Sequence, residues 1–136
     1  LLPSRRYFLQ AYLYLDVNVF EDSTHYLTKA VYDPFVSFFH YPDSKVGDVF
    51  INMFFDLFEI EKRAMQEQLQ ATSADDVNGI KTIYNISLEN VSRTSRKYVK
   101  EVERGKDEVS VKRWNKYINE NLKIDNFKFY RLEFEE

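Results

Sequence analysis

Residues 48–63, DVFINMFFDLFEIEKR, contain four phenylalanines and four carboxylates. On a helix at 100° per residue, the apolar side chains between Val46 and Met65 cover an arc of roughly 200°. An amphipathic helix of a globular domain needs little more than about 100°. We therefore expect a core helix that requires more than one neighbour. Ile51 lies at the edge of the arc and Phe55 beyond it, which makes both candidates for contact with a partner.

The polar side of the same stretch has the spacing of half a metal site. Asp48, Asn52, Asp56 and Glu59 fall within an arc about 80° wide. Di-iron bundles, however, combine Glu with Glu-x-x-His pairs on two further helices. Neither of the two histidines of the chain lies in such a motif. The pattern favours a solvated acidic face, with no metal and no cofactor.

Helix signals recur along the chain, and three glycines and three prolines are few for an all-β protein. We predict an all-α fold, a bundle of about four to six helices in one domain, 1–136. Residues 43–122 form its core, with long helices at 44–71, opened by Asp43 and Ser44, and at 74–104, opened by a Ser73–Asp76 capping box. Gly105 is predicted to stop the second long helix in the left-handed conformation, and a further helix covers about 107–121. The tail, 123–136, is predicted to be irregular or strand-like.

The N-terminal segment, 1–42, is predicted to form short aromatic-rich helices. Ser4 is a candidate N-cap for the first, and Asp33 with Pro34 for another. Fifteen of the 23 aromatic residues lie between Tyr7 and Phe58, a surplus typical of interfaces. A first helix would be apolar on every side, which indicates burial within a larger assembly. The candidate partner contacts are therefore Tyr7, Tyr12, Tyr14, Ile51, Phe55, Phe127 and Phe129.

Charge divides the chain unevenly. Residues 7–92 hold five basic and 13 acidic side chains, whereas residues 93–116 hold nine basic and four acidic ones. A stripe at helical spacing, Arg93, Lys97, Lys100 and Arg104, is a candidate site for an acidic or anionic partner. The alternative is a solvated face paired with acids of the preceding helix. Because no stacking aromatics are interleaved and the chain is acidic overall, the pattern disfavours specific nucleic-acid binding.

Catalytic signatures are missing from the sequence. There is no cysteine, no Gly-x-Ser-x-Gly turn and no glycine-rich phosphate loop. No apolar run approaches the roughly 18 residues of a spanning helix. These observations predict a protein that is not an enzyme and has no transmembrane span.

We therefore expect a non-catalytic interaction or accessory subunit of a multisubunit complex, which binds other subunits or itself. The complex could be membrane-associated or organellar. The alternative is a small-molecule-binding helical effector domain of a regulator; a helical metal-carboxylate enzyme ranks third. Because the chain begins with Leu1, we expect a processed product or a fragment. The sequence favours an intracellular location and leaves a mature mitochondrial protein as an alternative.

The excess apolar surface of the 48–63 helix gives one direct prediction. Phe55→Ser should weaken association with a partner more than it destabilises the fold, because Phe55 lies outside the main apolar arc. Light scattering for association and thermal melting for stability would be compared on the same samples. A large fall in melting temperature with unchanged association would instead assign Phe55 to the core.

Overall fold

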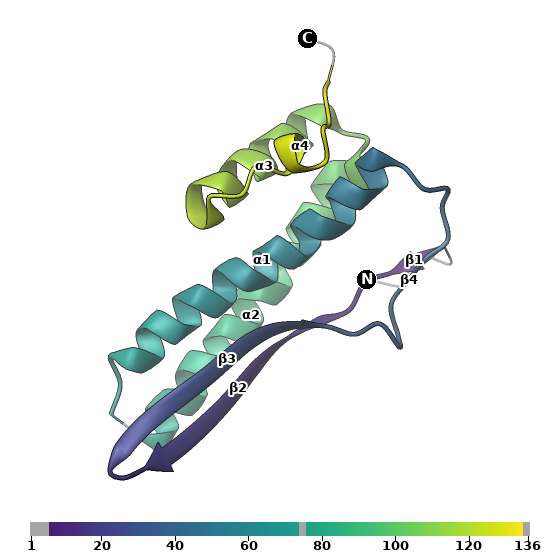
Figure 1. Ribbon diagram of the computed structural model, residues 1–136. Coiled ribbons are helices and arrows are strands. Elements are labelled where there is room, and N and C mark those ends of the chain that lie inside the picture. The colour runs from purple at the N-terminus through teal and green to yellow at the C-terminus, as the bar shows by residue number, and fades with distance from the viewer. Residues whose placement is uncertain (1–5, 74–75, 135–136) are drawn as a thin grey trace.

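The computed structural model describes residues 6–73 and 76–134, and the described chain mixes helices with two small antiparallel sheets (Figure 1). The all-α prediction is therefore wrong. In chain order the elements are β1 (Tyr7–Phe8), β2 (Ala11–Phe20), β3 (Ser23–Tyr32), β4 (Phe38–Phe39), α1 (Lys45–Gln70), α2 (Val77–Val102), the 3-10 turn η1 (Glu103–Gly105), α3 (Glu108–Leu122) and α4 (Asn126–Phe129).

Helix α1 lies at the centre and contacts α2, α3, α4 and the β2–β3 hairpin. Its predicted N-cap is confirmed, since the Ser44 hydroxyl accepts from the Gly47 N–H at 2.9 Å. Figure 1 shows α2 beside it, the hairpin along another side, and α3 with α4 across the end where α1 begins. The wide apolar arc is thus covered by three kinds of neighbour within one chain.

The largest correction concerns residues 11–32, which form a β-hairpin instead of helices. β2 and β3 pair antiparallel over ten residues each, from Ala11 opposite Tyr32 to Phe20 opposite Ser23. The connecting residues, Glu21 and Asp22, both have positive φ, at 49° and 65°. That combination marks a type I′ turn, whose twist matches the twist of paired strands.

The alternation of inward-facing and exposed side chains explains why residues 11–15 form a strand. Ala11, Leu13 and Leu15 point inward, whereas Tyr12 and Tyr14 are exposed. Wrapped as a helix, these residues would be apolar on every side; as a strand they form one buried face and one exposed face. The inner face is fastened at the α1–α2 turn, where the Tyr26 hydroxyl donates to the Thr72 carbonyl oxygen at 3.3 Å.

The predicted helix at Asp33 and Pro34 is reduced to a single turn. The Asp33 side chain accepts from the N–H groups of Phe35 and Val36, at 2.9 and 3.3 Å, as an N-cap would. The chain then enters β4, which pairs with β1. The proposed N-cap at Ser4 lies outside the described residues.

The second long helix begins and ends inside its predicted bounds. Asp76, not Ser73, is the N-cap, since its carboxylate accepts from the Gly79 N–H at 2.9 Å. The helix ends at Val102, and the left-handed Gly105 that the sequence predicted is confirmed at φ +90°. A side chain there would meet Val46, whose Cγ1 lies 2.6 Å from the position of an added Cβ. The described part of the tail contains the short helix α4 and no strand.

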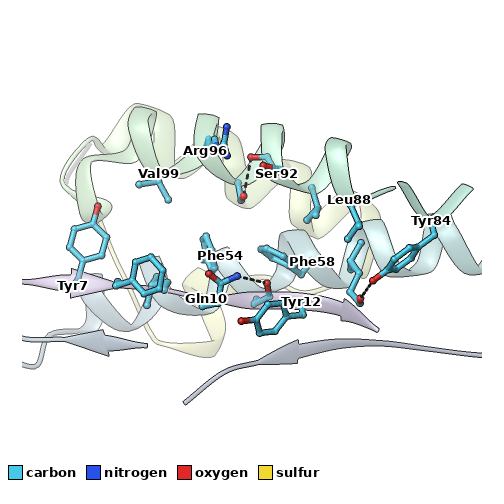
Figure 2. Close-up of a pocket in the computed structure, with 16 residues that line it drawn as sticks. Tyr7, Gln10, Tyr12, Phe54, Phe58, Tyr84, Leu88, Ser92, Arg96 and Val99 are labelled. Atoms are coloured by element: carbon cyan, nitrogen blue, oxygen red, sulfur yellow. Dashed lines mark hydrogen bonds between the residues drawn. The ribbon is translucent and has the colours of Figure 1, made fainter. Parts of the chain in front are cut away.

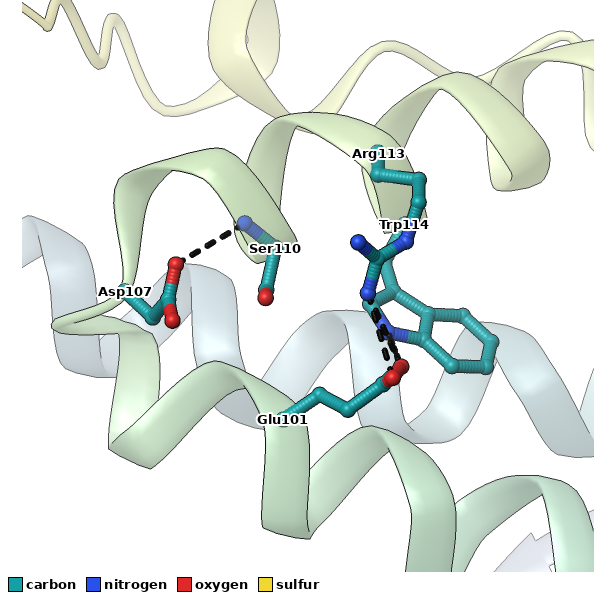
Figure 3. Close-up of polar contacts among 5 residues, drawn as sticks. All are labelled: Glu101, Asp107, Ser110, Arg113 and Trp114. Atoms are coloured by element: carbon teal, nitrogen blue, oxygen red, sulfur yellow. Dashed lines mark hydrogen bonds and ion pairs between the residues drawn. The ribbon is translucent and has the colours of Figure 1, made fainter.

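Polar contacts fix the corner between α2 and α3 (Figure 3). The Glu101 carboxylate accepts from the Arg113 guanidinium at 2.9 and 3.1 Å and from the Trp114 indole N–H at 3.2 Å. The Asp107 carboxylate caps α3 by accepting from the Ser110 N–H at 3.0 Å. Trp114 then packs edge-on against Tyr98 of α2, with ring centroids 5.6 Å apart. These contacts have a structural role.

A buried polar network attaches α4 to α1 and α3. The Asn126 side-chain amide donates to the Asp56 carboxylate at 2.9 Å and accepts from Asn52, and its backbone N–H donates to the Asn115 side-chain oxygen at 3.0 Å. Asp56 is only 8% exposed, so its predicted place on a solvated face is wrong. Burial raises the pKa of Asp56, the Asn126 hydrogen bond opposes this, and the charge of Glu59 adds to it.

Replacing Asn126 should therefore loosen the C-terminal end of the fold. Asn126→Ala removes both hydrogen bonds of that amide and leaves Asp56 and Asn52 without this partner. We expect a loss of about 3 kcal/mol in unfolding free energy, because unpaired buried polar groups are costly. Urea unfolding measures it, with Asn119→Ala on the exposed face of α3 as the matched control. Equal losses for the two variants would contradict a role for the network.

The charge of Asp56 should make stability depend on pH. Because the pKa of Asp56 is raised in the folded state, this group stabilises the fold at pH values below its ordinary pKa of 3.8. The contribution is lost as the pH rises through the folded-state pKa. Asp56→Asn keeps an acceptor oxygen for Asn126 but cannot ionise. Its stability relative to wild type should therefore increase between about pH 3 and about pH 7. Urea unfolding at both pH values, with Asp48→Asn as an exposed control on α1, would refute this if the two variants behaved alike.

Candidate binding groove

A groove of about 540 Å³ runs between the hairpin and α2 (Figure 2). Residues 7–13, from β1 to the first half of β2, form one wall. Phe54 and Phe58 of α1 contribute from the core side. The volume lies within the range of about 300–1,000 Å³ that is usual for binding sites.

The opposite wall is one face of α2. Its members recur at intervals of three and four residues, as helical geometry requires: Tyr84, Leu88, Val91, Ser92, Ser95, Arg96 and Val99. In Figure 2 the strand and the helix run in opposite directions, with Tyr7 near Val99 and Tyr84 at the far end. The Ser95 hydroxyl donates to the Ser92 carbonyl oxygen at 3.2 Å. Because these two side chains are small, they leave space in the middle of the groove.

The edge of β2 that faces α2 has backbone groups that β3 does not use. Phe20 and Ser23 flank the two-residue turn, and such a flanking pair exchanges both of its hydrogen bonds. Hydrogen-bonded pairs recur at every second residue from Phe20, so the even-numbered residues of β2 bond to β3. The odd-numbered residues direct their N–H and C=O groups away from β3. The Asp33 N–H donates to the Gln10 carbonyl oxygen at 3.0 Å, which agrees with this alternation.

Side chains cover part of this free edge. The Tyr84 hydroxyl donates to the Leu13 carbonyl oxygen at 3.0 Å, and the Gln10 side-chain amide donates to the Ala11 carbonyl oxygen at 3.2 Å. The N–H groups of Ala11 and Leu13 have no acceptor among residues 6–73 and 76–134. Both residues are nearly inaccessible, at 4% and 3% exposed. The groove thus contains backbone donors whose usual partner would be another strand or water.

The electrostatics of the groove are positive. Of the described residues that line it, Arg96 is charged and none is acidic. Arg96 is exposed, and its guanidinium has no ion pair or hydrogen bond within the described chain. A shallower depression that also contains Glu89 and Arg93 adjoins Arg96 on the outside of α2. At one end of the groove, burial raises the pKa of Tyr7, which the charge of Arg104 opposes and Tyr41 reinforces.

The groove has the chemistry of a binding site. Its lining, within the described residues, includes no histidine or carboxylate to act as an acid or base near Ser92 or Ser95. The apolar walls, the free strand edge and the arginine are features that can hold and orient a ligand. In the described part of the chain, no group of three or more potential metal ligands comes together.

The predicted partner contacts fall in separate places. Tyr7 lines the groove. Tyr12 borders it, while its side chain lies on the outer face of the hairpin with that of Tyr14, which is 46% exposed. Phe127 packs against Phe134 at the C-terminal end, with ring centroids 5.3 Å apart, while Phe129 is 74% exposed there. In Figure 1 α4 lies away from the hairpin, so these residues do not form one surface.

Phe55 and Ile51 are partly buried residues of α1. Both are half-buried and pack against the core. The ring of Phe55 meets Tyr32 of β3 edge-to-face, with centroids 4.6 Å apart. The hairpin thus covers the apolar surface around Phe55, for which the sequence alone indicated no neighbour within the chain. Because of this contact, Phe55→Ser should also lower the free energy of unfolding by about 2 kcal/mol.

The predicted basic stripe is broken at its C-terminal end. Arg93, Lys97 and Lys100 are exposed on α2, and Arg93 donates to the Asn90 side chain at 2.9 Å. Arg104 lies beyond the end of α2 in a left-handed conformation, with its guanidinium 3.9 Å from the centre of the Tyr41 ring. The remaining three residues lie about 100° or less from Arg96 around the helix.

Sequence reasoning missed the groove residues on α2. Arg96 falls beside the basic stripe in the sequence, and Ser92 and Ser95 resemble ordinary polar helix residues. The one signal in the sequence is spacing: Leu88, Ser92, Ser95 and Val99 recur every three or four residues and so share one face of the helix. That signal becomes meaningful once β2 is placed opposite.

Comparison of the chain with protein-family profiles, curated proteins and solved structures found no match in any of the three searches. None of the helices within residues 6–73 and 76–134 combines the length with the apolar character that a membrane span requires.

Proposed function

We propose that this chain is a non-catalytic protein-interaction module, an accessory part of a larger assembly, and that it docks a partner segment in the groove between β2 and α2. The observation that carries the proposal is the free edge of β2 inside that groove. Unpaired N–H groups at Ala11 and Leu13 are donors that a polypeptide partner would satisfy.

The outer face of the hairpin gives further support. Side chains on this face include Tyr12, Tyr14, Leu27 and Phe20, which are 48%, 46%, 45% and 67% exposed. No layer of the described chain covers them. Large exposed apolar residues on one sheet face are typical of protein contacts.

A second candidate function is the binding of a small amphipathic anion. The volume of the groove, about 540 Å³, and the pairing of Phe54 and Phe58 with a cationic rim at Arg96 support it. Apolar pockets with a few convergent polar groups are the usual sites for such molecules. This candidate ranks below the first because a small carboxylate at Arg96 would leave the β2 edge unpaired.

Blocking the groove tests the proposal. Ser92→Trp places a large ring against the strand wall and should abolish retention of a partner protein from the source cells. Affinity capture with wild-type and variant chains, followed by mass spectrometry, would show this difference. The matched control is Ile86→Trp, an exposed position on α2 that faces away from the groove.

The outcomes separate the two candidates. A protein lost with Ser92→Trp and kept with Ile86→Trp supports the docking role. Solvent extraction of the wild-type chain that yields a stoichiometric fatty acid or similar anion, with no protein dependent on the groove, would favour the second. Circular dichroism of both variants checks that the fold is kept.

A further inference from the structure

We propose that the groove binds its partner as an extended strand that pairs with the free edge of β2 and places an acidic side chain opposite Arg96. The inference rests on the proposed function, because it names the conformation and charge of the segment that the same groove would hold. It concerns the class of partner: a peptide of alternating apolar and polar residues with at least one carboxylate.

Backbone complementarity is the first argument. An added strand supplies C=O groups to the N–H groups of Ala11 and Leu13, which are buried without an acceptor in the described chain. Leaving such a donor unpaired costs about 1–3 kcal/mol. The carbonyl oxygens of the same two residues accept from side chains of Gln10 and Tyr84, and each oxygen has a second lone pair for an incoming N–H.

The dimensions of the groove fit a short strand. Its strand wall, residues 7–13, spans about 20 Å, and its helix wall from Leu88 to Val99 spans about 17 Å. Five or six extended residues have that length at about 3.3 Å each. A paired strand lies about 4.8 Å from β2, and the small side chains of Ser92 and Ser95 leave room for its backbone.

The side-chain pattern follows from the two faces of the added strand. Residues that point toward the core meet Phe54, Phe58 and Val91, so they must be apolar. Residues that point outward pass Arg96, which is exposed and has no ion pair within the described chain. A carboxylate there gains a charge-assisted hydrogen bond, whereas a lysine would be repelled.

Helical and small-molecule occupants fit less well. A helix about 10 Å wide satisfies its own backbone and offers nothing to the β2 edge. A fatty acid or similar anion could reach Arg96 but has no donors and acceptors at strand spacing. A second copy of the chain would have to offer the free edge of β3, which contains no acidic residue, because the free edge of β2 faces its own α2.

Random linear octapeptides displayed on phage, selected against the full chain, test this inference. The enriched peptides should alternate apolar and polar residues and share one Asp or Glu. N-methylation at every second position of the best peptide should weaken binding by about tenfold or more, and at the intervening positions by no more than about twofold. Hydrogen exchange at Ala11 and Leu13 should slow in its presence.

Charge reversal supplies the matched comparison. Arg96→Glu should weaken the acidic peptide by about tenfold, and exchanging the peptide's acid for lysine should restore binding. Lys97→Glu makes the same charge change on the neighbouring residue, which points about 100° away, and should alter binding by about twofold or less. Equal effects of the two variants would overturn the proposed role of Arg96.

The remaining outcomes distinguish the strand from the groove itself. Peptides that Ser92→Trp excludes but that show no alternation under N-methylation would refute the strand and leave the docking groove in place. Peptides that bind wild type and Ser92→Trp equally, or no enrichment at all, would refute the groove as a protein-docking site.

Discussion

The apolar surface of α1 is the constraint on which the rest of the structure depends. An arc of roughly 200° cannot be covered by one helix, so α1 needs neighbours on several sides. α2 covers one side, where Phe50 stacks on Tyr98 with ring centroids 5.7 Å apart and the Tyr98 hydroxyl donates to the Phe50 carbonyl oxygen. The hairpin covers another through Tyr32 and Phe55. The short C-terminal helices cover the end.

The groove is a geometric consequence of this arrangement. Two paired strands are only about 5 Å apart, whereas two packed helices have axes about 8–10 Å apart. A two-stranded sheet therefore cannot cover both α1 and α2 fully. Its contacts fall mainly on α1, through β3, and β2 approaches α2 closely at Tyr84. The gap left beside β2 is lined by a free strand edge, which a broader sheet would have paired.

Polar groups inside the fold determine how the C-terminal segment is attached. Asn126 bonds to Asp56, Asn52 and Asn115 at once, and its side-chain amide both donates and accepts. The burial of a carboxylate opposes folding at neutral pH, but the network fixes α4 in one position against two helices. Glu101 has a similar role at the other corner, where it accepts from both Arg113 and Trp114. None of the residues in these two networks lines the groove, so their role is to position the scaffold.

The sequence by itself determined the helical half of the protein. Ser44, Asp107 and Gly105 act as local signals whose chemistry needs no distant partner, and they mark where α1 begins, where α3 begins and where the α2–α3 corner turns. It did not determine the hairpin, because Tyr12 to Leu15 suit a buried helix and a two-sided strand equally, and the Glu21–Asp22 turn lacks the glycine that usually identifies one. Nor could it find the groove. Leu13, Phe54 and Arg96 are ordinary residues in three separate segments, and they line one groove only because tertiary packing brings a strand edge, a core face and a helix together.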